Sequence, residues 1–431
     1  MNTTGVNEMT SGKVERTTSS LSVMTSGYWA SPWPAEDGGP TREQRTRSIQ
    51  VGEPTVTSRL AVASTMVVRR DSGEWYLLCH TGGDDAVSWV EKFHPTTLDM
   101  ERRSVDLPGG LTWPGGLAVH ANGDIYVTFG RYVHRLTPDL DLVASRELPR
   151  NRPYNSLVIL SDGTIITKDF GGARPGEPVA WEAPDCEVVA LTPDLEIVAT
   201  CTLTEGSVAR LSATATSVVV VGVSAVHVVE WSGSQLHLRS SFEYRVEGEG
   251  YGWDAVLADG RAWFLNNGAG SSSFDGSLKD KGVARSPQCV VSVDLHTGGV
   301  TRFLVSEQEG SLVANPPAVD SRRQVVVGYD SAHGIVRGYS YAQNPPALLW
   351  ERSQWHACHP IVVEDDGYVV LNDFNFAEQR DELVVVETMT GREVARAVTA
   401  SPLQSVLFGA PGDANDLYLC SFTHLNRIAW T

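Results

Sequence analysis

The sequence predicts an all-β protein, a single β-propeller with eight four-stranded blades. Two observations carry this prediction. Short runs of β-branched and aromatic residues recur between Gly, Asp, Asn and Pro, and convincing amphipathic helices are hard to find. The same pattern of strands and turns returns roughly every 40–60 residues, which is the spacing of propeller blades. Seven blades is the alternative count, if one unit is divided wrongly.

Two segments that nearly copy each other define the repeat. HRLTPDLDLVAS (134–145) and VALTPDLEIVAT (189–200) each read as strand, TPDL turn, strand. A hairpin precedes each copy, with Asn-Gly or Asp-Gly at its turn, where both residues need positive φ. The unit is therefore strand a, tight turn, strand b, connection, strand c, turn and strand d. The predicted units are 57–108, 109–149, 150–204, 205–246, 247–305, 306–354, 355–400 and 401–431. Their a–b turns are predicted near Gly73, Gly123, Gly163, Thr216, Gly260, Arg322, Gly367 and Ala414.

The two ends of the chain are predicted to close the ring together. The unit 401–431 offers strands a, b and c only. We expect TRSIQVGE (46–53) to add the missing outer strand, because this pairing removes two open sheet edges. Residues 46–431 are thus predicted to form the propeller. Residues 1–45 are predicted to be a disordered leader, since their beginning is polar, rich in Ser, Thr and Gly, and lacks the pattern of a secretory signal.

Composition and charge exclude several classes of protein. The net charge is −18 over 431 residues and no basic patch is visible, which argues against a nucleic-acid partner. No apolar run approaches the length of a membrane span. The six cysteines form no CxxC pair, so we expect reduced thiols and a cytoplasmic protein rather than a disulfide or zinc framework. The sequence does not indicate an oligomeric state.

Polar residues of the repeats gather at one face of the predicted propeller. Strand a lines the central channel, and its start shares a face with the end of strand b; we call this face the top. The b–c connections at the top are long in 171–185 and 267–288, and the second is expected to be either a lid or a disordered loop. Since many blades bring a titratable or amide group to this face, a binding or active site is predicted there.

The hexapeptide WHACHP (355–360) lies at this face, at the start of strand a in the seventh unit. Its two histidines could hold a metal ion, act as a base, or simply cap the strand by bonding the backbone. Neighbouring units bring further imidazoles to the top, so a divalent or transition metal ion is expected, with no nucleotide cofactor. The predicted metal ligands are His80, His333, His359, His424 and Asn155.

Other side chains are predicted to act on a small-molecule substrate. The catalytic candidates are His359, His356, Asp254 and Lys168, as bases, acids or an anion-binding group. The substrate-binding candidates are Trp113, Tyr154, Trp253, Asn267 and Asp373. Several have a structural alternative: hydrogen bonding at a strand end for Asp254, an ion pair with Asp169 or with another blade for Lys168, and packing between blades for the aromatic rings.

The repeated pattern of Pro-Asn and Asp-Gly before apolar residues resembles the broad propeller superfamilies. These include the gluconolactonase/SMP-30 group, strictosidine synthase, streptogramin lyase and the quinoprotein-like proteins. The first group implies an axial divalent metal held by Glu, Asn and Asp, and Asn155 in RPYNS resembles that Asn, while the position of the Glu falls near Ser64-Thr65. Streptogramin lyase implies a His base. The tryptophan-docking signature of the quinoprotein dehydrogenases is not seen.

These observations lead to two hypotheses about function. The first is a small-molecule enzyme at the top of the channel, either a metal-assisted, lactonase-like hydrolase or a lyase that uses a His base. The alternative is a non-catalytic propeller that binds a protein or ligand on its top face. An oxidoreductase with a quinone cofactor is a third hypothesis.

Overall fold

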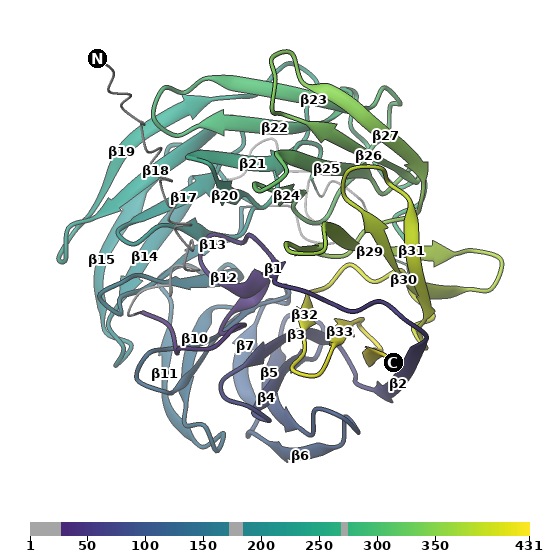
Figure 1. Ribbon diagram of the computed structural model, residues 1–431. Helices are drawn as coiled ribbons and strands as arrows, with labels where there is room; N and C mark the ends of the chain where they lie inside the picture. The colour runs from purple at the N-terminus through teal and green to yellow at the C-terminus, as the bar shows by residue number, and fades with distance from the viewer. Residues whose placement is uncertain (1–26, 172–183, 269–274) are drawn as a thin grey trace, which may run out of the picture.

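The computed structural model describes residues 27–171, 184–268 and 275–431. Eight antiparallel sheets form a ring around a central channel, with the first strand of each blade innermost (Figure 1). The prediction of an all-β propeller with eight blades is therefore confirmed, and each predicted a–b turn lies between the first and second strands of a blade. The one helix among the described residues is the short 3-10 helix η1 (Glu36–Gly38).

The strands follow one another in chain order around the ring. Blades 1 and 2 are β3–β6 (Ser64–Arg69, Trp75–His80, Ala86–Phe93, Met100–Arg103) and β8–β11 (Gly116–Val119, Ile125–Phe129, Tyr132–Leu136, Leu142–Glu147). Blades 3 and 4 are β12–β15 (Tyr154–Ile159, Ile165–Asp169, Glu187–Leu191, Ile197–Thr202) and β16–β19 (Ser212–Ala213, Ser217–Val221, Ala225–Trp231, Leu236–Glu243). Blades 5 and 6 are β20–β23 (Val256–Ala258, Arg261–Leu265, Gln288–Asp294, Val300–Ser306) and β24–β27 (Ala318–Asp320, Val325–Asp330, Ile335–Ser340, Ala347–Ser353). Blades 7 and 8 are β28–β31 (Ile361–Val363, Tyr368–Asn375, Arg380–Glu387, Glu393–Val398) and β32–β34 (Gly409–Pro411, Asp416–Cys420, His424–Trp430) with β2 (Pro54–Leu60); β7 (Leu107–Gly110) pairs with β5.

Burial explains why the second strands are mostly apolar and the outer strands are not. The second strand of a blade has a neighbouring blade on each of its faces, so both sets of alternating side chains are buried. All five residues of β17 (SVVVV) are buried, whereas β15 (IVATCT) at the rim is exposed or half-buried along its whole length. The continuous Val and Ile runs of the sequence are thus packing between blades.

The outer strand of blade 8 is β2 rather than the predicted segment 46–53. β2 pairs antiparallel with β34, from Pro54 opposite Trp430 to Leu60 opposite His424. The prediction that the N-terminal part of the chain closes the ring is confirmed. The closing strand, however, lies several residues later in the chain than predicted. The reason is that Arg45–Thr46 forms β1, which runs parallel to the innermost strand β28. The residues after β1 carry the chain from the axis to the rim (Figure 1).

Residues 27–47, which we call the plug, lie against the inner strands and not in a separate leader. Backbone N–H groups at the ends of four innermost strands donate to its carbonyls: Val119 to Pro34, Ala213 to Pro40, Leu257 to Thr41 and Val362 to Gln44, at 2.7–2.8 Å. These strands belong to blades 2, 4, 5 and 7, so the plug crosses the a–b turn end of the channel. The prediction that the chain is disordered up to residue 45 is wrong for residues 27–45, while residues 1–26 lie outside the described residues.

The opposite, top end is covered over blades 6 to 8 by residues 275–287, which we call the cover segment. Leu278 is buried against Leu312, Ala332 and Ala357, and the Gln404 N–H donates to the Gly276 carbonyl at 2.8 Å. This part of the predicted insertion 267–288 is therefore packed across the top like a lid. Residues 172–183 of the other long connection are outside the described residues.

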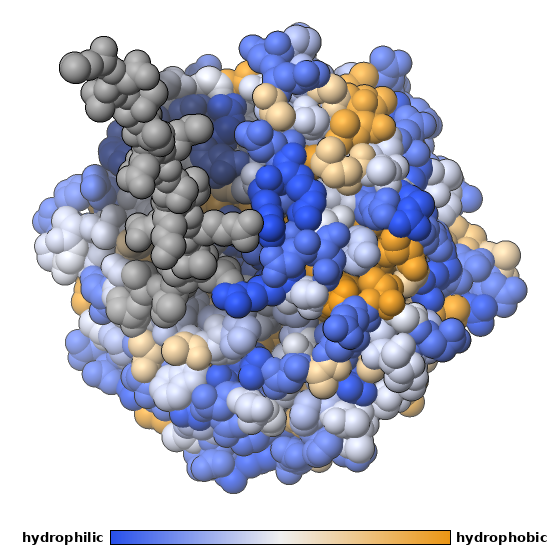
Figure 2. Space-filling view, in the orientation of Figure 1, coloured by the Kyte–Doolittle hydropathy of each residue, from blue (hydrophilic) through white to orange (hydrophobic). Residues whose placement is uncertain are grey.

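The face seen in Figure 2 is mostly hydrophilic, with separate hydrophobic patches. This agrees with the net charge of −18. None of the helical structure in the described residues has the length and apolar character that a membrane crossing requires.

Candidate active site in the channel

The residues just before or at the start of the innermost strands face the channel axis. Blades 3, 4, 5, 7 and 8 contribute Asn155, Arg210, Asp254, His359 and Phe408 to this layer. All five are at most 6% exposed. The ring architecture thus brings together side chains that are up to about 250 residues apart in the chain, as expected when equivalent positions of successive blades surround one axis.

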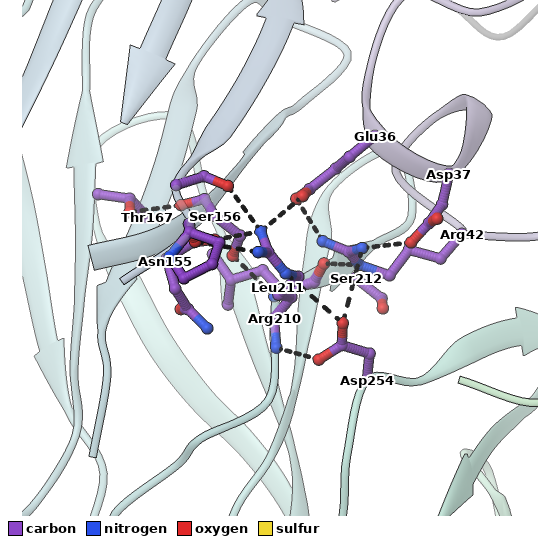
Figure 3. Close-up of polar contacts among 12 residues, drawn as sticks. Glu36, Asp37, Arg42, Asn155, Ser156, Thr167, Arg210, Leu211, Ser212 and Asp254 are labelled. Atoms are coloured by element: carbon purple, nitrogen blue, oxygen red, sulfur yellow. Dashed lines mark hydrogen bonds and ion pairs between the residues drawn. The ribbon is translucent and has the colours of Figure 1, made fainter. Parts of the chain in front are cut away.

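Arg210 spans the channel and joins four parts of the molecule (Figure 3). Its Nη1 donates to the Gly115 carbonyl and to Glu36 Oε2, both at 2.8 Å, and also to the Asn155 carbonyl. Its backbone N–H donates to Asp254 Oδ1 at 2.6 Å. Arg210 thus ties blades 2, 3 and 5 to the plug through hydrogen bonds whose partners are all buried.

The plug inserts two carboxylates and a second guanidinium beside Arg210. Arg42 donates through Nε to the Leu211 carbonyl at 2.7 Å, through Nη1 to Asp37 Oδ2 at 2.5 Å, and through Nη2 to Glu36. Burial raises the pKa of Glu36 to about 7, against the opposing charges of Arg42 and Arg210. The plug is therefore held in the channel by charge-assisted hydrogen bonds in a site from which water is largely excluded.

His359 completes this buried network from blade 7. Its Nδ1 lies 2.8 Å from Asp37 Oδ1, and its ring packs against Phe408 with 3.8 Å between the ring centroids and 31° between the ring planes. Burial alone would raise the pKa of Asp37, but the charges and hydrogen bonds of His359 and Arg42 outweigh it and hold this pKa below its usual value. An ionised Asp37 accepts a hydrogen bond, which places the imidazole proton on Nδ1.

The other ring nitrogen of His359 is available for chemistry. No residue in the described part of the chain bonds to its Nε2. A carboxylate that fixes the tautomer and orientation of an imidazole is the arrangement that makes the second nitrogen a general base. The geometry thus supports proton transfer at His359 Nε2.

Three further polar atoms of the same part of the channel have no hydrogen-bond partner. These are Asn155 Oδ1, Asp254 Oδ2 and Trp253 Nε1, all buried. Buried polar atoms in native proteins nearly always find partners, so atoms without one indicate a place for water or a ligand. The donor of Trp253 and the acceptor of Asn155 suit a small molecule with hydroxyl or amide groups, while Asp254 Oδ2 lies 3.7 Å from Arg210 Nε.

The predicted metal site is not assembled in the described residues. Among them, no three His, Cys, Asp or Glu side chains form a group that could hold a metal ion. His80 Nδ1 bonds the Thr81 carbonyl at 2.8 Å, His333 Nδ1 bonds Asp330 Oδ2 at 2.7 Å, and His424, at the start of the third strand of blade 8, bonds Thr423 Oγ1 at 2.9 Å. Each imidazole therefore reaches the top face but uses a local partner there.

The two remaining catalytic candidates from the sequence, His356 and Lys168, have structural surroundings. Burial lowers the pKa of His356 to about 3, and its Nδ1 accepts the Asn372 N–H at 3.1 Å. Burial also lowers the pKa of Lys168, whose Nζ donates to the carbonyls of Asp169 at 3.2 Å and Ser207 at 3.1 Å. Lys168 thus bridges blades 3 and 4 and does not form the alternative ion pair with the Asp169 carboxylate, which binds Arg150 instead.

The predicted aromatic wall is packed into the propeller. Trp113 stacks on Phe170 at 4.2 Å between ring centroids, and Phe170 shares one apolar cluster with Trp253. The hydroxyl of the fully buried Tyr154 accepts the Arg150 N–H at 3.2 Å. Of these rings, Trp253 carries the unpaired donor described above and is the one that could still contact a ligand.

Polar residues at the ends of the second strands mostly anchor the backbone. Asn267 accepts the Gly250 N–H at 2.9 Å and donates to the Ser286 carbonyl at 3.2 Å, so it fixes the end of the cover segment. Asp373 accepts the Trp355 N–H at 2.8 Å. The interpretation as strand-end hydrogen bonding, and not as substrate binding, describes both contacts.

The sequence analysis missed four residues of the network: Glu36, Asp37, Arg42 and Arg210. Three of them lie in PAEDGGPTREQ, within the stretch assigned to the leader. The signal available was the change from a Ser- and Thr-rich stretch to one with Trp, Pro, an Asp-Gly pair and paired charges. Arg210 lies at the same position before strand a as Asp254 and His359, which a strict alignment of the blades would have shown.

Comparison with known proteins supports the fold and does not identify a family. No protein-family model and no curated protein matches the sequence. Among solved structures, the Dos1 propeller matches with a TM-score of 0.57 and 9% identity over 86% of this chain and 94% of that chain. BamB from Moraxella catarrhalis matches with 0.53 and 13% over 86% and 100%, and AztD from Citrobacter koseri with 0.50 and 10% over 84% and 100%. At this level of identity the likeness shows the β-propeller fold alone.

Proposed function

We propose that the protein is a small-molecule enzyme that uses His359 as a general base, the second of the two reactions considered from the sequence. The observation that carries the proposal is the contact of 2.8 Å between His359 Nδ1 and Asp37, with Nε2 left free. The substrate would lie in the upper channel, beside the Asn155 Oδ1 and Trp253 Nε1 atoms, which have no hydrogen-bond partner. Abstraction of a proton next to a carbonyl, followed by elimination, is the lyase chemistry that such a base performs.

The test begins with the imidazole itself. The nitrogen NMR shifts of the His359 ring are expected to report a proton on Nδ1 and none on Nε2 in the wild type. Asp37→Asn would let the side-chain amide donate to Nδ1 and so move the proton to Nε2, which removes the base. A wild-type ring protonated on Nε2 alone would contradict the proposal.

Turnover of a panel of lactones, esters and β-elimination substrates tests the reaction class. We expect His359→Gln and Asp37→Asn to lower kcat by about 10²–10⁴-fold, the range of general base catalysis. His424→Gln is the matched control, an imidazole on the same face that bonds only Thr423, and should keep full activity. Equal loss in all three variants, or none in His359→Gln, would overturn the assignment. Preference for lactones over elimination substrates would make the protein a hydrolase with the same base.

A further inference from the structure

A group of aromatic side chains lies on the top face, at the edge of the cover segment. It is not part of the network around His359. The indole of Trp355 and the ring of Phe376 meet nearly at a right angle, with 4.9 Å between their centroids and 77° between their planes. Phe374 packs edge-on against Phe376 at 4.9 Å. Trp355 and Phe376 are half-buried, so the two rings form an open aromatic corner.

The chain's own lysine occupies this corner. The Nζ atom of Lys279 lies 5.0 Å from the Trp355 centroid and 4.9 Å from that of Phe376, within the range of cation–π attraction for both rings. In the part of the chain that the structure describes, Lys279 forms no ion pair, whereas Lys281, two residues on, pairs with Asp275. The ammonium of Lys279 is therefore held by aromatic faces and not by a carboxylate.

The corner is rigid because the backbone around Trp355 is fixed. The Trp355 N–H donates to Asp373 Oδ1 at 2.8 Å, and its carbonyl accepts from Gln404 Nε2 at 3.1 Å. Gly334 lies beneath the indole, where a Cβ atom would come within 2.8 Å of the ring. A site formed before its ligand arrives loses little entropy on binding, which favours recognition.

We propose that the Trp355–Phe376 corner is a binding site for alkylated ammonium groups, in which Lys279 is the occupant that the chain supplies. A methylated ammonium is less hydrated than the lysine ammonium, so it gives up less on leaving water and keeps the attraction to both rings. Lys279 is exposed and sits on a flexible four-carbon stem, so its ammonium can move into solvent when a ligand arrives. This site is independent of the proposed reaction at His359.

The first experiment is calorimetric titration with choline and with its neutral isostere 3,3-dimethylbutan-1-ol. We expect choline to bind the wild type and to bind Lys279→Ala about fivefold to tenfold more tightly, because the internal competitor is gone. Phe376→Leu and Trp355→Leu should each weaken choline binding by a similar factor, with unchanged circular dichroism. Lys281→Ala is the matched control and should bind like the wild type.

Three results would overturn the proposal. They are equal binding of choline and the neutral alcohol, choline affinity unchanged in Phe376→Leu, and no binding by Lys279→Ala up to about 10 mM. Phe376→Leu keeps the test decisive if Trp355→Leu does not fold. A second arm compares a peptide that carries trimethyllysine with its unmethylated form. Preference for the methylated peptide over free choline identifies a protein partner as the source of the ammonium, and the reverse identifies a small molecule.

Discussion

Replacement of Arg42 by alanine would leave Glu36 and Asp37 in the channel without the cation they share. Removal of one partner from a buried ion pair costs about 3–5 kcal/mol, because the remaining charge stays buried and uncompensated. The side chains of Arg42, Glu36 and Asp37 are 1%, 4% and 1% exposed, so solvent screens little of this cost. Arg210 and His359 still reach one carboxylate each, which places the expected loss of unfolding free energy near the lower end, about 3 kcal/mol.

The loss of unfolding free energy in Arg42→Ala should depend on pH, and the buried carboxyl groups determine whether it grows or shrinks as pH rises. Without Arg42 the folded-state pKa of Glu36, already above its unfolded value, rises further, because Arg42 is the first of the charges that oppose the effect of burial. A carboxyl of this kind costs no stability below its unfolded pKa, and its cost grows as pH rises until the folded pKa is passed. Since Glu36 already has a pKa of about 7 with Arg42 present, the share of the loss that comes from Glu36 should be small at about pH 4.5 and larger at about pH 8.

Urea unfolding at these two pH values measures the effect. Arg45→Ala is the matched control, an arginine of the same segment that pairs with Glu43 and Glu364 but is 31% exposed. Its loss is expected to be below about 1 kcal/mol at both pH values. If Arg42→Ala costs no more than Arg45→Ala at pH 8, the plug is not held by the buried charges, and the account of the channel given above fails.

Three further predictions follow from single contacts. Because the pKa of Glu36 rises from 4.5 to about 7 on folding, this group lowers stability as pH increases from 4.5 to 7, by roughly 3 kcal/mol; Glu36→Gln should flatten that part of the pH profile of unfolding. A Cβ on Gly338 would lie 2.3 Å from the Trp350 indole, so Gly338→Ala should lower the free energy of unfolding by about 1–3 kcal/mol, while Gly82→Ala, with open space around it, should not. Chelation with EDTA should leave the melting temperature within about 1 °C, and a larger fall would reveal a metal site that the described residues do not form.

The fold could be predicted from the sequence because the strands and turns of a blade are indicated by local sequence patterns. Asx-Gly turns and continuous Val and Ile runs are properties of short segments, and together they located the first hairpins of the blades, although only some of these hairpins have an Asx-Gly turn. The closing strand needed more than that, since 46–53 and 54–60 are both rich in residues that favour strands. Which of the two segments forms the outer strand depends on where the plug leaves the channel axis. This is a property of the tertiary structure that the local sequence does not indicate.

For a related reason, only part of the candidate site could be predicted from the sequence. His359 could be placed on the axis from its position in the repeat, but its partner Asp37 is 322 residues away and outside the repeat. The prediction of a metal centre assumed that side chains on one face share one cavity. His80 and His424 show why this does not hold: they lie at the end of a second strand and the start of a third strand, where the nearest polar groups belong to their own turns.

The charge of the channel connects the plug to the proposed chemistry. Glu36, Asp37 and Asp254 bring three carboxylates into contact with only two guanidinium groups, those of Arg42 and Arg210. One proton on Glu36 balances these charges. While Glu36 holds it, which its pKa of about 7 permits at neutral pH, His359 is free to accept another from a substrate. The imidazolium that then forms faces an ionised Asp37, so the charge created by the reaction is stabilised where it appears. Glu36→Gln keeps that position neutral, and we therefore expect it to retain the base while Asp37→Asn loses it.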